Sequence, residues 1–110
     1  MYIYNVTTNV DESIHEEWLN WMKSIHIPAM LATGKFTTAK MIQVLINEEM
    51  GGTTYAVQYS TDSLETLESY YNTDAQKFQQ QAFQLFGEKI VSFRTELKII
   101  SEQFSISVNN

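Results

Sequence analysis

The spacing of apolar residues switches along the chain between a repeat of two and a helical repeat, and the order of these switches constrains the fold most. The segments that result are, in order, a strand over 2–10, a helix over 12–26, a strand over 35–47, a strand over 53–60, two helical pieces over 62–87 and a strand over 89–100. A chain of 110 residues in this order predicts one domain with a β-α-β-β-α-β arrangement.

The first helix has the clearest pattern. When successive residues from Ile14 are turned by about 100°, one arc of about 160° collects the apolar side chains and both histidines. That arc contains Ile14, His15, Trp18, Leu19, Trp21, Met22, Ile25 and His26. Pro28 disfavours an α conformation at Ile27, which predicts a break in the helix there, and Gly34 predicts the end of a short following piece.

The two middle strands are predicted to form a hairpin. Residues 35–47 are so rich in apolar side chains that their second half is predicted to be buried on both faces. Gly51 and Gly52 supply the positive φ angles that a tight turn needs, and residues 53–60 alternate as the partner strand.

The second helical region is predicted to consist of two pieces, capped by Asp62 and Thr73. Their apolar faces contain Leu64, Leu67 and Tyr71 in the first piece, and Phe78, Ala82, Leu85 and Phe86 in the second. The strand over 89–100 has one apolar face. The alternation continues around Phe104, Ile106 and Val108, so the segment over 101–110 either adds a short strand or docks on a partner. The predicted domain spans 1–104, and residues 105–110 form a C-terminal tail.

This order of elements is that of the ferredoxin-like sandwich, an α+β fold in which helices cover one face of an antiparallel sheet. The other face is predicted to carry Ile3 and Met41 together with tyrosines, and soluble monomers rarely expose large apolar patches. A second copy of the chain is therefore predicted to cover this face. The resulting homodimer would be an α/β barrel whose interior includes Asn5, Thr7 and Gln58.

Three short motifs carry a resemblance to a known family: Trp18-x-x-Trp21-Met22, His26-Ile27-Pro28 and Thr33-Gly34-Lys35-Phe36. With the order of elements, they resemble a bacterial family of domains of unknown function, number 4286, within the dimeric α/β-barrel superfamily. The resemblance covers nearly the whole chain except the tail. It implies a small-molecule site between sheet and helices, and it implies a functional histidine near the end of the first helix, where His26 lies. The wider superfamily includes monooxygenases, muconolactone isomerases, sugar mutarotases and haem-handling proteins.

Composition excludes several classes of partner. A formal net charge of −6 and a single arginine argue against nucleic acid, because duplex binding needs cations that displace condensed counterions. No apolar run of about 18 residues is present, and the acidic balance disfavours anionic membrane surfaces. The absence of cysteine excludes disulfides and thiol nucleophiles, and with an N-terminus unlike a signal peptide it predicts a cytoplasmic protein.

His26 is the candidate catalytic residue, because a neutral imidazole exchanges protons near physiological pH. The structural alternative is that His26 only caps the helix end. No metal site is predicted, since Glu12-x-x-His15 lacks its second pair and Leu19 stands where a zinc helix needs a histidine. No cofactor is predicted either, and no haem attachment motif is present.

The candidate ligand-binding residues are Asn5, Trp18, Met22, Met30, Phe36 and Gln58. The aromatic residues among them are explained equally well as core, because their spacing already accounts for each position. The leading hypothesis is a cytoplasmic homodimer with a binding or structural role and no assignable activity. The alternative is a cofactor-independent isomerase or monooxygenase that acts on a small hydrophobic carbonyl or phenolic compound, with His26 as the acid or base. A pocket of roughly 300 Å³ or more would favour the enzyme or a ligand carrier, and a packed interior the structural role.

Overall fold

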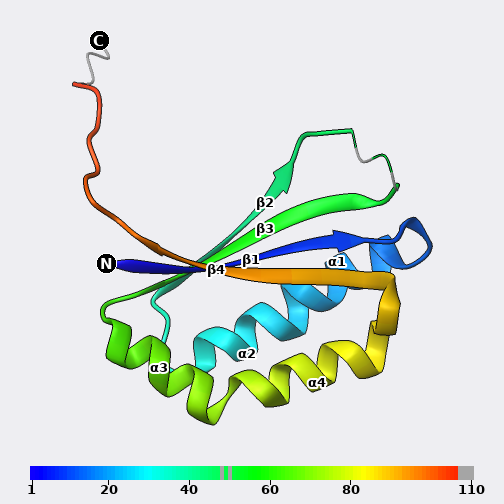
Figure 1. Ribbon diagram of the computed structural model, residues 1–110, viewed down its shortest axis with the longest axis horizontal. Coiled ribbons are helices and arrows are strands. Elements are labelled where there is room, and N and C mark those ends of the chain that lie inside the picture. The colour runs from blue at the N-terminus through cyan, green and yellow to red at the C-terminus, as the bar shows by residue number, and fades with distance from the viewer. Residues whose placement is uncertain (48, 50, 107–110) are drawn as a thin grey trace.

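Strand β1 (Tyr2–Val10) lies at the centre of a four-stranded antiparallel sheet with the strand order β2-β3-β1-β4 (Figure 1). It pairs with β3 (Thr53–Thr61) and β4 (Ile90–Lys98), and β2 (Thr38–Val44) pairs with β3 at the edge. The computed structural model describes residues 1–47, 49 and 51–106. The order of the strands confirms the predicted ferredoxin-like fold.

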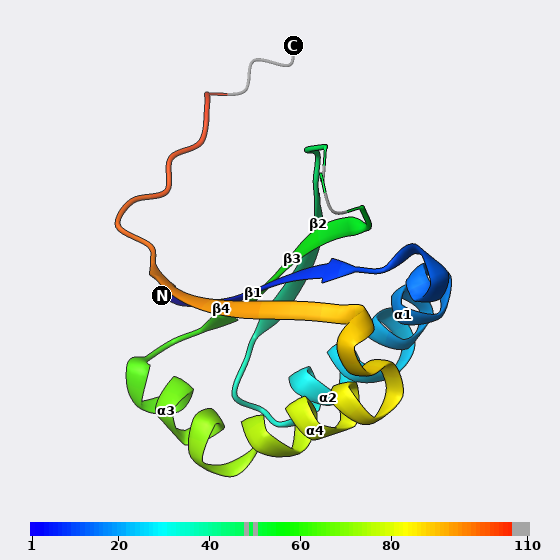
Figure 2. The ribbon, with the colours of Figure 1, turned by 45° about the vertical axis from the view of Figure 1, so that its right-hand side comes forward.

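The helices of the described residues all lie on one face of the sheet, as two ribbon views show (Figures 1 and 2). They are, in chain order, the 3-10 turn η1 (Glu12–Ile14), α1 (His15–Trp21), the π-helical turn η2 (Met22–His26), α2 (Ile27–Ala32), α3 (Leu64–Thr73), α4 (Ala75–Phe86) and the 3-10 turn η3 (Gly87–Lys89). Within the described part of the chain, none of them has both the length and the apolar character that crossing a bilayer requires.

Pro28 does not break the first helix, so the predicted break is wrong. Ile27 keeps right-handed helical angles of φ −62° and ψ −45°, and its N–H donates to the carbonyl of Met22 five residues earlier. The turn before the proline is therefore π-helical. A wider turn accommodates both the bulk of the proline ring and its missing N–H without ending the helix. His26 is the last residue of this irregular turn.

The caps and the buried face of α3 differ by one residue from the prediction. Ser63, rather than Asp62, caps α3, and its hydroxyl accepts a hydrogen bond from a backbone N–H of the first turn at 3.1 Å. The helix buries Leu67 and Tyr70, and it exposes Leu64 and Tyr71. Leu67 is therefore the residue that the predicted and the observed buried faces share, and Tyr70 takes the buried place that was predicted for Tyr71.

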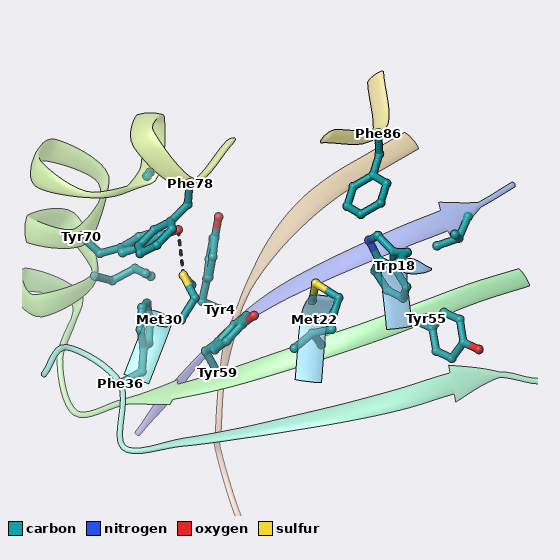
Figure 3. Close-up of a cluster of buried hydrophobic side chains, with 14 residues drawn as sticks. Tyr4, Trp18, Met22, Met30, Phe36, Tyr55, Tyr59, Tyr70, Phe78 and Phe86 are labelled. Atoms are coloured by element: carbon teal, nitrogen blue, oxygen red, sulfur yellow. Dashed lines mark hydrogen bonds between the residues drawn. The ribbon is translucent and has the colours of Figure 1, made fainter. Parts of the chain in front are cut away.

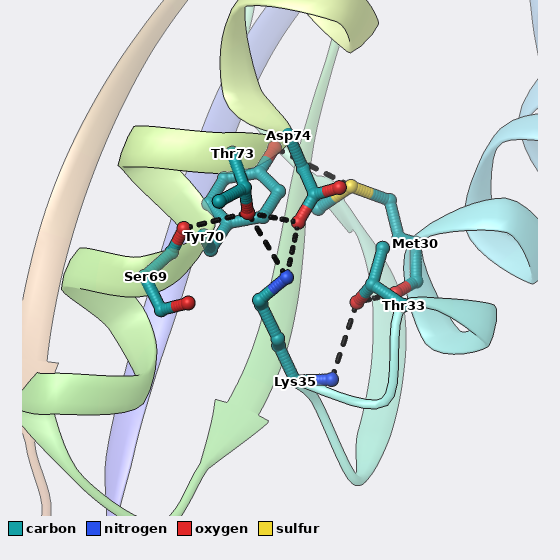
Figure 4. Close-up of polar contacts among 7 residues, drawn as sticks. All are labelled: Met30, Thr33, Lys35, Ser69, Tyr70, Thr73 and Asp74. Atoms are coloured by element: carbon teal, nitrogen blue, oxygen red, sulfur yellow. Dashed lines mark hydrogen bonds and ion pairs between the residues drawn. The ribbon is translucent and has the colours of Figure 1, made fainter.

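A polar cluster ties the loop after α2 to the corner between α3 and α4 (Figure 4). The Lys35 ammonium lies 2.6 Å from a carboxylate oxygen of Asp74, and it also donates to the Thr73 hydroxyl at 3.0 Å. Asp74, rather than Thr73, occupies the position before α4. The ammonium lowers the pKa of Asp74, because its hydrogen bond favours the charged carboxylate.

Tyr4 holds the core together at the centre of the sheet (Figure 3). Its side chain is 1% exposed, and its ring centroid lies between 5.3 and 6.2 Å from those of four other aromatic residues. These are Phe36, Tyr59, Tyr70 and Tyr71. They come from the loop before β2, from β3 and from α3, so one tyrosine joins three parts of the fold.

Strand β4 turns its apolar side away from the helices. In the register with β1, Val6 pairs with Arg94 and Thr7 with Phe93, so Arg94 lies on the helix side and Phe93 on the opposite side. We call the sheet face opposite the helices the open face. Val91 and Phe93 lie on it and are 63% and 62% exposed. The predicted uncovered apolar face is therefore present, and β4 contributes most of it.

The prediction that the second half of β2 is buried on both faces is wrong within the protomer. Ile42 is 38% exposed, and Leu45 and Ile46, which lie beyond the end of the strand, are more exposed still. β2 is an edge strand, so no second neighbour covers it. Met41 pairs with Val57 and lies on the helix side, which corrects its predicted place on the open face. The tyrosines expected there lie on the helix side as well, since Tyr4 pairs with Tyr59.

The C-terminal segment leaves the body of the protein. Residues 100–106 follow β4 without joining the sheet, and they run away on the side opposite the helices (Figures 1 and 2). Ile100, Phe104 and Ile106 are all exposed. The predicted short strand does not form over 101–106, and Val108 lies outside the described residues.

The loop between β2 and β3 provides a matched test of this fold. Gly51 and Gly52 both have positive φ angles, +82° and +79°, but a Cβ on Gly52 would lie 2.6 Å from the carbonyl oxygen of Val10, whereas one on Gly51 would meet nothing within 4 Å. Each alanine variant loses about 1 kcal/mol to the left-handed backbone. We expect Gly52→Ala to lose roughly 1–2 kcal/mol more than Gly51→Ala in urea denaturation, because β1 must shift. Equal losses would contradict this packing.

Candidate functional site

A small cavity lies between the sheet and the helices. Its volume is about 60 Å³, and residues from α1, η2 and α4 line it on one side and residues from β1, β3 and β4 on the other. The wall is mostly aromatic and apolar, and both tryptophans of the chain, Trp18 and Trp21, belong to it. A cavity of this volume has room for ordered water.

His26 lies in this wall between two aromatic rings. Its imidazole stacks on Trp21 with 4.8 Å between ring centroids, and it meets the edge of Phe78 at 5.5 Å. The Nδ1 atom is buried and has no hydrogen-bond partner. Burial, together with the positive charge of Arg94, lowers the pKa of His26 to about 4, and burial is the larger cause. The ring is therefore neutral at physiological pH.

Tyr59 contributes a second unpartnered polar atom to the same cavity. Its hydroxyl is buried without a hydrogen bond, and Figure 3 shows it directed toward the space between Tyr4 and Met22. Burial raises the pKa of Tyr59, so the hydroxyl keeps its proton. The hydroxyl of Tyr70, by contrast, donates to the sulfur of Met30 at 3.4 Å. An unpartnered buried hydroxyl costs about 1–3 kcal/mol, which makes its presence informative.

The cavity adjoins a shallower hollow between α4 and β4. This hollow has a volume of about 150 Å³ and shares part of its lining with the cavity, including Gln79, Ser92 and Arg94. We call it the mouth. It exists because the helix-facing side of β4 is polar, as Ser92 and Arg94 illustrate, so α4 does not pack closely against that strand.

Arg94 is the site residue that the sequence analysis missed. The period-two pattern of β4 placed it on a polar side, and a polar side of an edge strand is usually assigned to solvent. Only the pairing of Val6 with Arg94 places that side toward the helices. The available signal was that Arg94 is the single arginine of the chain.

The predicted ligand-binding residues fall into three places. Trp18, Met22 and Met30 line the cavity together with His26. Phe36 is buried in the aromatic cluster around Tyr4, 6.0 Å from its ring, and is not part of the cavity wall.

Asn5 and Gln58 pair with each other across the open face. Because successive residues of a strand point to opposite faces, they cannot reach the cavity of their own protomer. The Asn5 amide nitrogen donates to the Thr7 hydroxyl at 3.1 Å, and its carbonyl oxygen is buried without a partner.

The second histidine has a structural explanation. His15 Nε2 lies 2.6 Å from the hydroxyl of Tyr55, and the two rings stack at 5.7 Å. Among the residues that the structure describes, no group of three or more histidine, aspartate or glutamate side chains gathers as a metal site would require.

A family model described as "Domain of unknown function (DUF4286)" matches residues 1–100. No curated protein is similar enough to count as a match. Similar solved structures include a dimeric ferredoxin-like protein from an uncultured marine organism, with a TM-score of 0.66, 12% identity, and coverage of 93% of this chain and 97% of that chain. A second such protein, also from an uncultured marine organism, has a TM-score of 0.67, 13% identity, and coverage of 94% and 99%.

A third similar structure is an ethyl tert-butyl ether d (ethd) family protein from Bacillus halodurans C-125. Its TM-score is 0.61 and its identity 14%, with coverage of 86% of this chain and 97% of that chain. At such low identities, the likeness shows the ferredoxin-like fold alone.

Burial of a neutral His26 makes stability depend on pH. The unfolded chain takes up a proton near pH 6.5, whereas the folded chain resists it until about pH 4, so stability falls as the pH drops through this window. We expect the free energy of unfolding to fall by roughly 2 kcal/mol more in the wild type than in His26→Phe between about pH 7 and pH 5. Urea denaturation at both pH values measures this difference. Equal slopes for wild type and His26→Phe would refute the assignment.

Proposed function

Because the chain belongs to the DUF4286 family, whose function is unknown, we propose a function from its geometry: it acts as a homodimer in which each protomer binds a small, largely apolar molecule. The observation that carries the binding role is a pair of buried polar atoms without partners, His26 Nδ1 and the Tyr59 hydroxyl, at one aromatic cavity. Natural interiors rarely leave such atoms unsatisfied. A bound molecule with one hydrogen-bonding group, or ordered water, would satisfy both.

The size of the cavity argues against a large substrate. A volume of about 60 Å³ is well below the roughly 300 Å³ typical of ligand pockets, so volume alone favours a packed, structural interior. The unpartnered atoms and the adjoining mouth are what favour a ligand. A ligand of more than a few atoms would extend from the cavity into the mouth.

Binding is favoured over catalysis by the state of His26. A histidine with a pKa of about 4 is a weak base at neutral pH, so it abstracts protons from carbon or phenol poorly. The second candidate is the cofactor-independent isomerase or monooxygenase acting on a small hydrophobic carbonyl or phenolic compound. The observation in its favour is that His26 and Tyr59, each of which has a buried polar atom without a partner, line the same cavity.

The open face supports the homodimer. It exposes Val91, Phe93 and Leu97 of β4 and Ile42 of β2, and soluble monomers rarely leave so many apolar side chains uncovered. At its centre, the buried carbonyl oxygen of Asn5 has no partner within the protomer, and a facing copy would bring further polar groups to it. Two structurally similar proteins are dimeric. The cytoplasm is the proposed compartment, in keeping with the absence of cysteine.

The open face can be tested with two phenylalanines that are almost equally exposed. Phe93 lies on the open face and is 62% exposed, whereas Phe83 lies on α4 and is 65% exposed. We expect Phe93→Glu to convert the dimer into a 12.7 kDa monomer, since a buried carboxylate without a partner is costly, and Phe83→Glu to remain dimeric. Size-exclusion chromatography with light scattering measures both masses. A monomeric wild type at micromolar concentration would refute the dimer.

Binding can be tested with phenylacetamide, a neutral probe with an apolar ring and one hydrogen-bonding group. At millimolar concentration it should raise the Tm of the wild type by about 2–5 °C, because it binds only the folded state. Tyr59→Phe should lose most of this rise. Tyr55→Phe is the matched control, since the Tyr55 hydroxyl contacts His15 outside the cavity. No rise with the wild type, or an undiminished rise with Tyr59→Phe, would count against the proposed site.

A further inference from the structure

The walls of the cavity and of its mouth contain hydrogen-bond donors and a cation, but no carboxylate. The chain has 13 acidic residues, yet none of those that the structure describes lines either space, whereas its single arginine lines both. Such a distribution is unexpected for an acidic protein whose ligand is a cation or a neutral molecule. It is what the recognition of an anion requires.

Arg94 is available to bind such an anion. Among the described residues, no carboxylate forms an ion pair with its guanidinium. Glu96, two residues along the same side of β4, is engaged by Tyr71, whose hydroxyl donates to it at 2.5 Å. A guanidinium offers five N–H donors in a fixed plane that fits both oxygens of a carboxylate.

A tyrosine hydroxyl lies next to the guanidinium of Arg94. Burial raises the pKa of Tyr4, and Arg94 offsets part of that rise by its charge and a hydrogen bond, so the two groups are close to each other. Burial also raises the pKa of Tyr70 and of Tyr59. All three hydroxyls therefore keep their protons, and the one that lies beside Arg94 is that of Tyr4.

The size of the cavity sets the shape of the ligand. An apolar cavity of roughly 150 Å³ holds a benzene molecule, so a ring does not fit within the inner 60 Å³ alone. An apolar body of that size would lie across the inner cavity and the mouth, and its far end would meet Arg94. A cation at the open end of an aromatic cavity fits a molecule with an apolar body and one terminal charge.

We propose that the ligand of this site is a small monocarboxylate with an apolar body, and that Arg94 binds its carboxylate at the mouth between α4 and β4. The proposal rests on the binding role proposed above. It assigns Arg94 as a specificity-determining residue, which distinguishes charged from neutral molecules of the same shape.

Phenylacetate and phenylacetamide test the charge, because they share the apolar ring and differ only at the terminal group. The two tryptophans both line the cavity, so their indole N–H signals in an NMR titration report occupancy directly. We expect the wild type to bind phenylacetate about tenfold more tightly than phenylacetamide. Arg94→Gln should abolish this preference, so that the two probes bind with similar affinity, and Arg94→Lys should keep part of it.

Lys98→Gln is the matched control, since it removes one positive charge from the same strand and lies outside the cavity wall. It should keep the wild-type preference. If the wild type binds both probes equally, or if Arg94→Gln keeps the preference, the carboxylate assignment is overturned while the binding role stands. If neither probe moves the indole signals of the wild type, the binding role fails together with it.

Discussion

The fold depends on the burial of one strand between two others, with Tyr4 at its middle. β1 has hydrogen-bonded neighbours along its whole length on both sides, and its helix-facing side chains pack against loops and helices that are distant in sequence. Tyr4 is almost fully buried there, among aromatic residues that come from three other segments. Aromatic rings bury a large area and prefer tilted or offset contacts, so this cluster sets both the stability and the geometry of the layer.

The orientation of β4 accounts for both the cavity and the open face. A strand can place its apolar side on only one face, and β4 places it away from the helices. Phe93 is therefore exposed on the open face, where a partner can cover it. Arg94 lies on the helix side, where a hollow separates it from α4. A shift of one residue in register would reverse both outcomes, removing the exposed apolar surface and the charged mouth together. In this way the proposed dimer and the proposed binding site derive from the same pairing.

The protonation states of the polar groups in the cavity favour the binding of a ligand over proton transfer to or from it. His26 is neutral because it is buried between Trp21 and Phe78 and near a guanidinium. The tyrosines are protonated for the same reason, since burial disfavours a charged phenolate. A site in which every titratable group is held in its neutral form, next to one permanent cation, is suited to holding a ligand in place.

The sequence alone predicted the element order, the ferredoxin-like fold and the presence of His26 in an apolar arc, because these follow from local periodicity. It predicted the cap and the buried face of α3 less well, since Ser63 and Asp62 are equally good caps, and packing against the sheet decides that Tyr70 rather than Tyr71 is buried. It could not determine which side of β4 faces the helices, nor that Asn5 and Gln58 are separated from Trp18 by the sheet. Those facts depend on the pairing of strands that lie far apart in the chain. Only the tertiary structure, in which Val6 meets Arg94, brought the single arginine to the cavity.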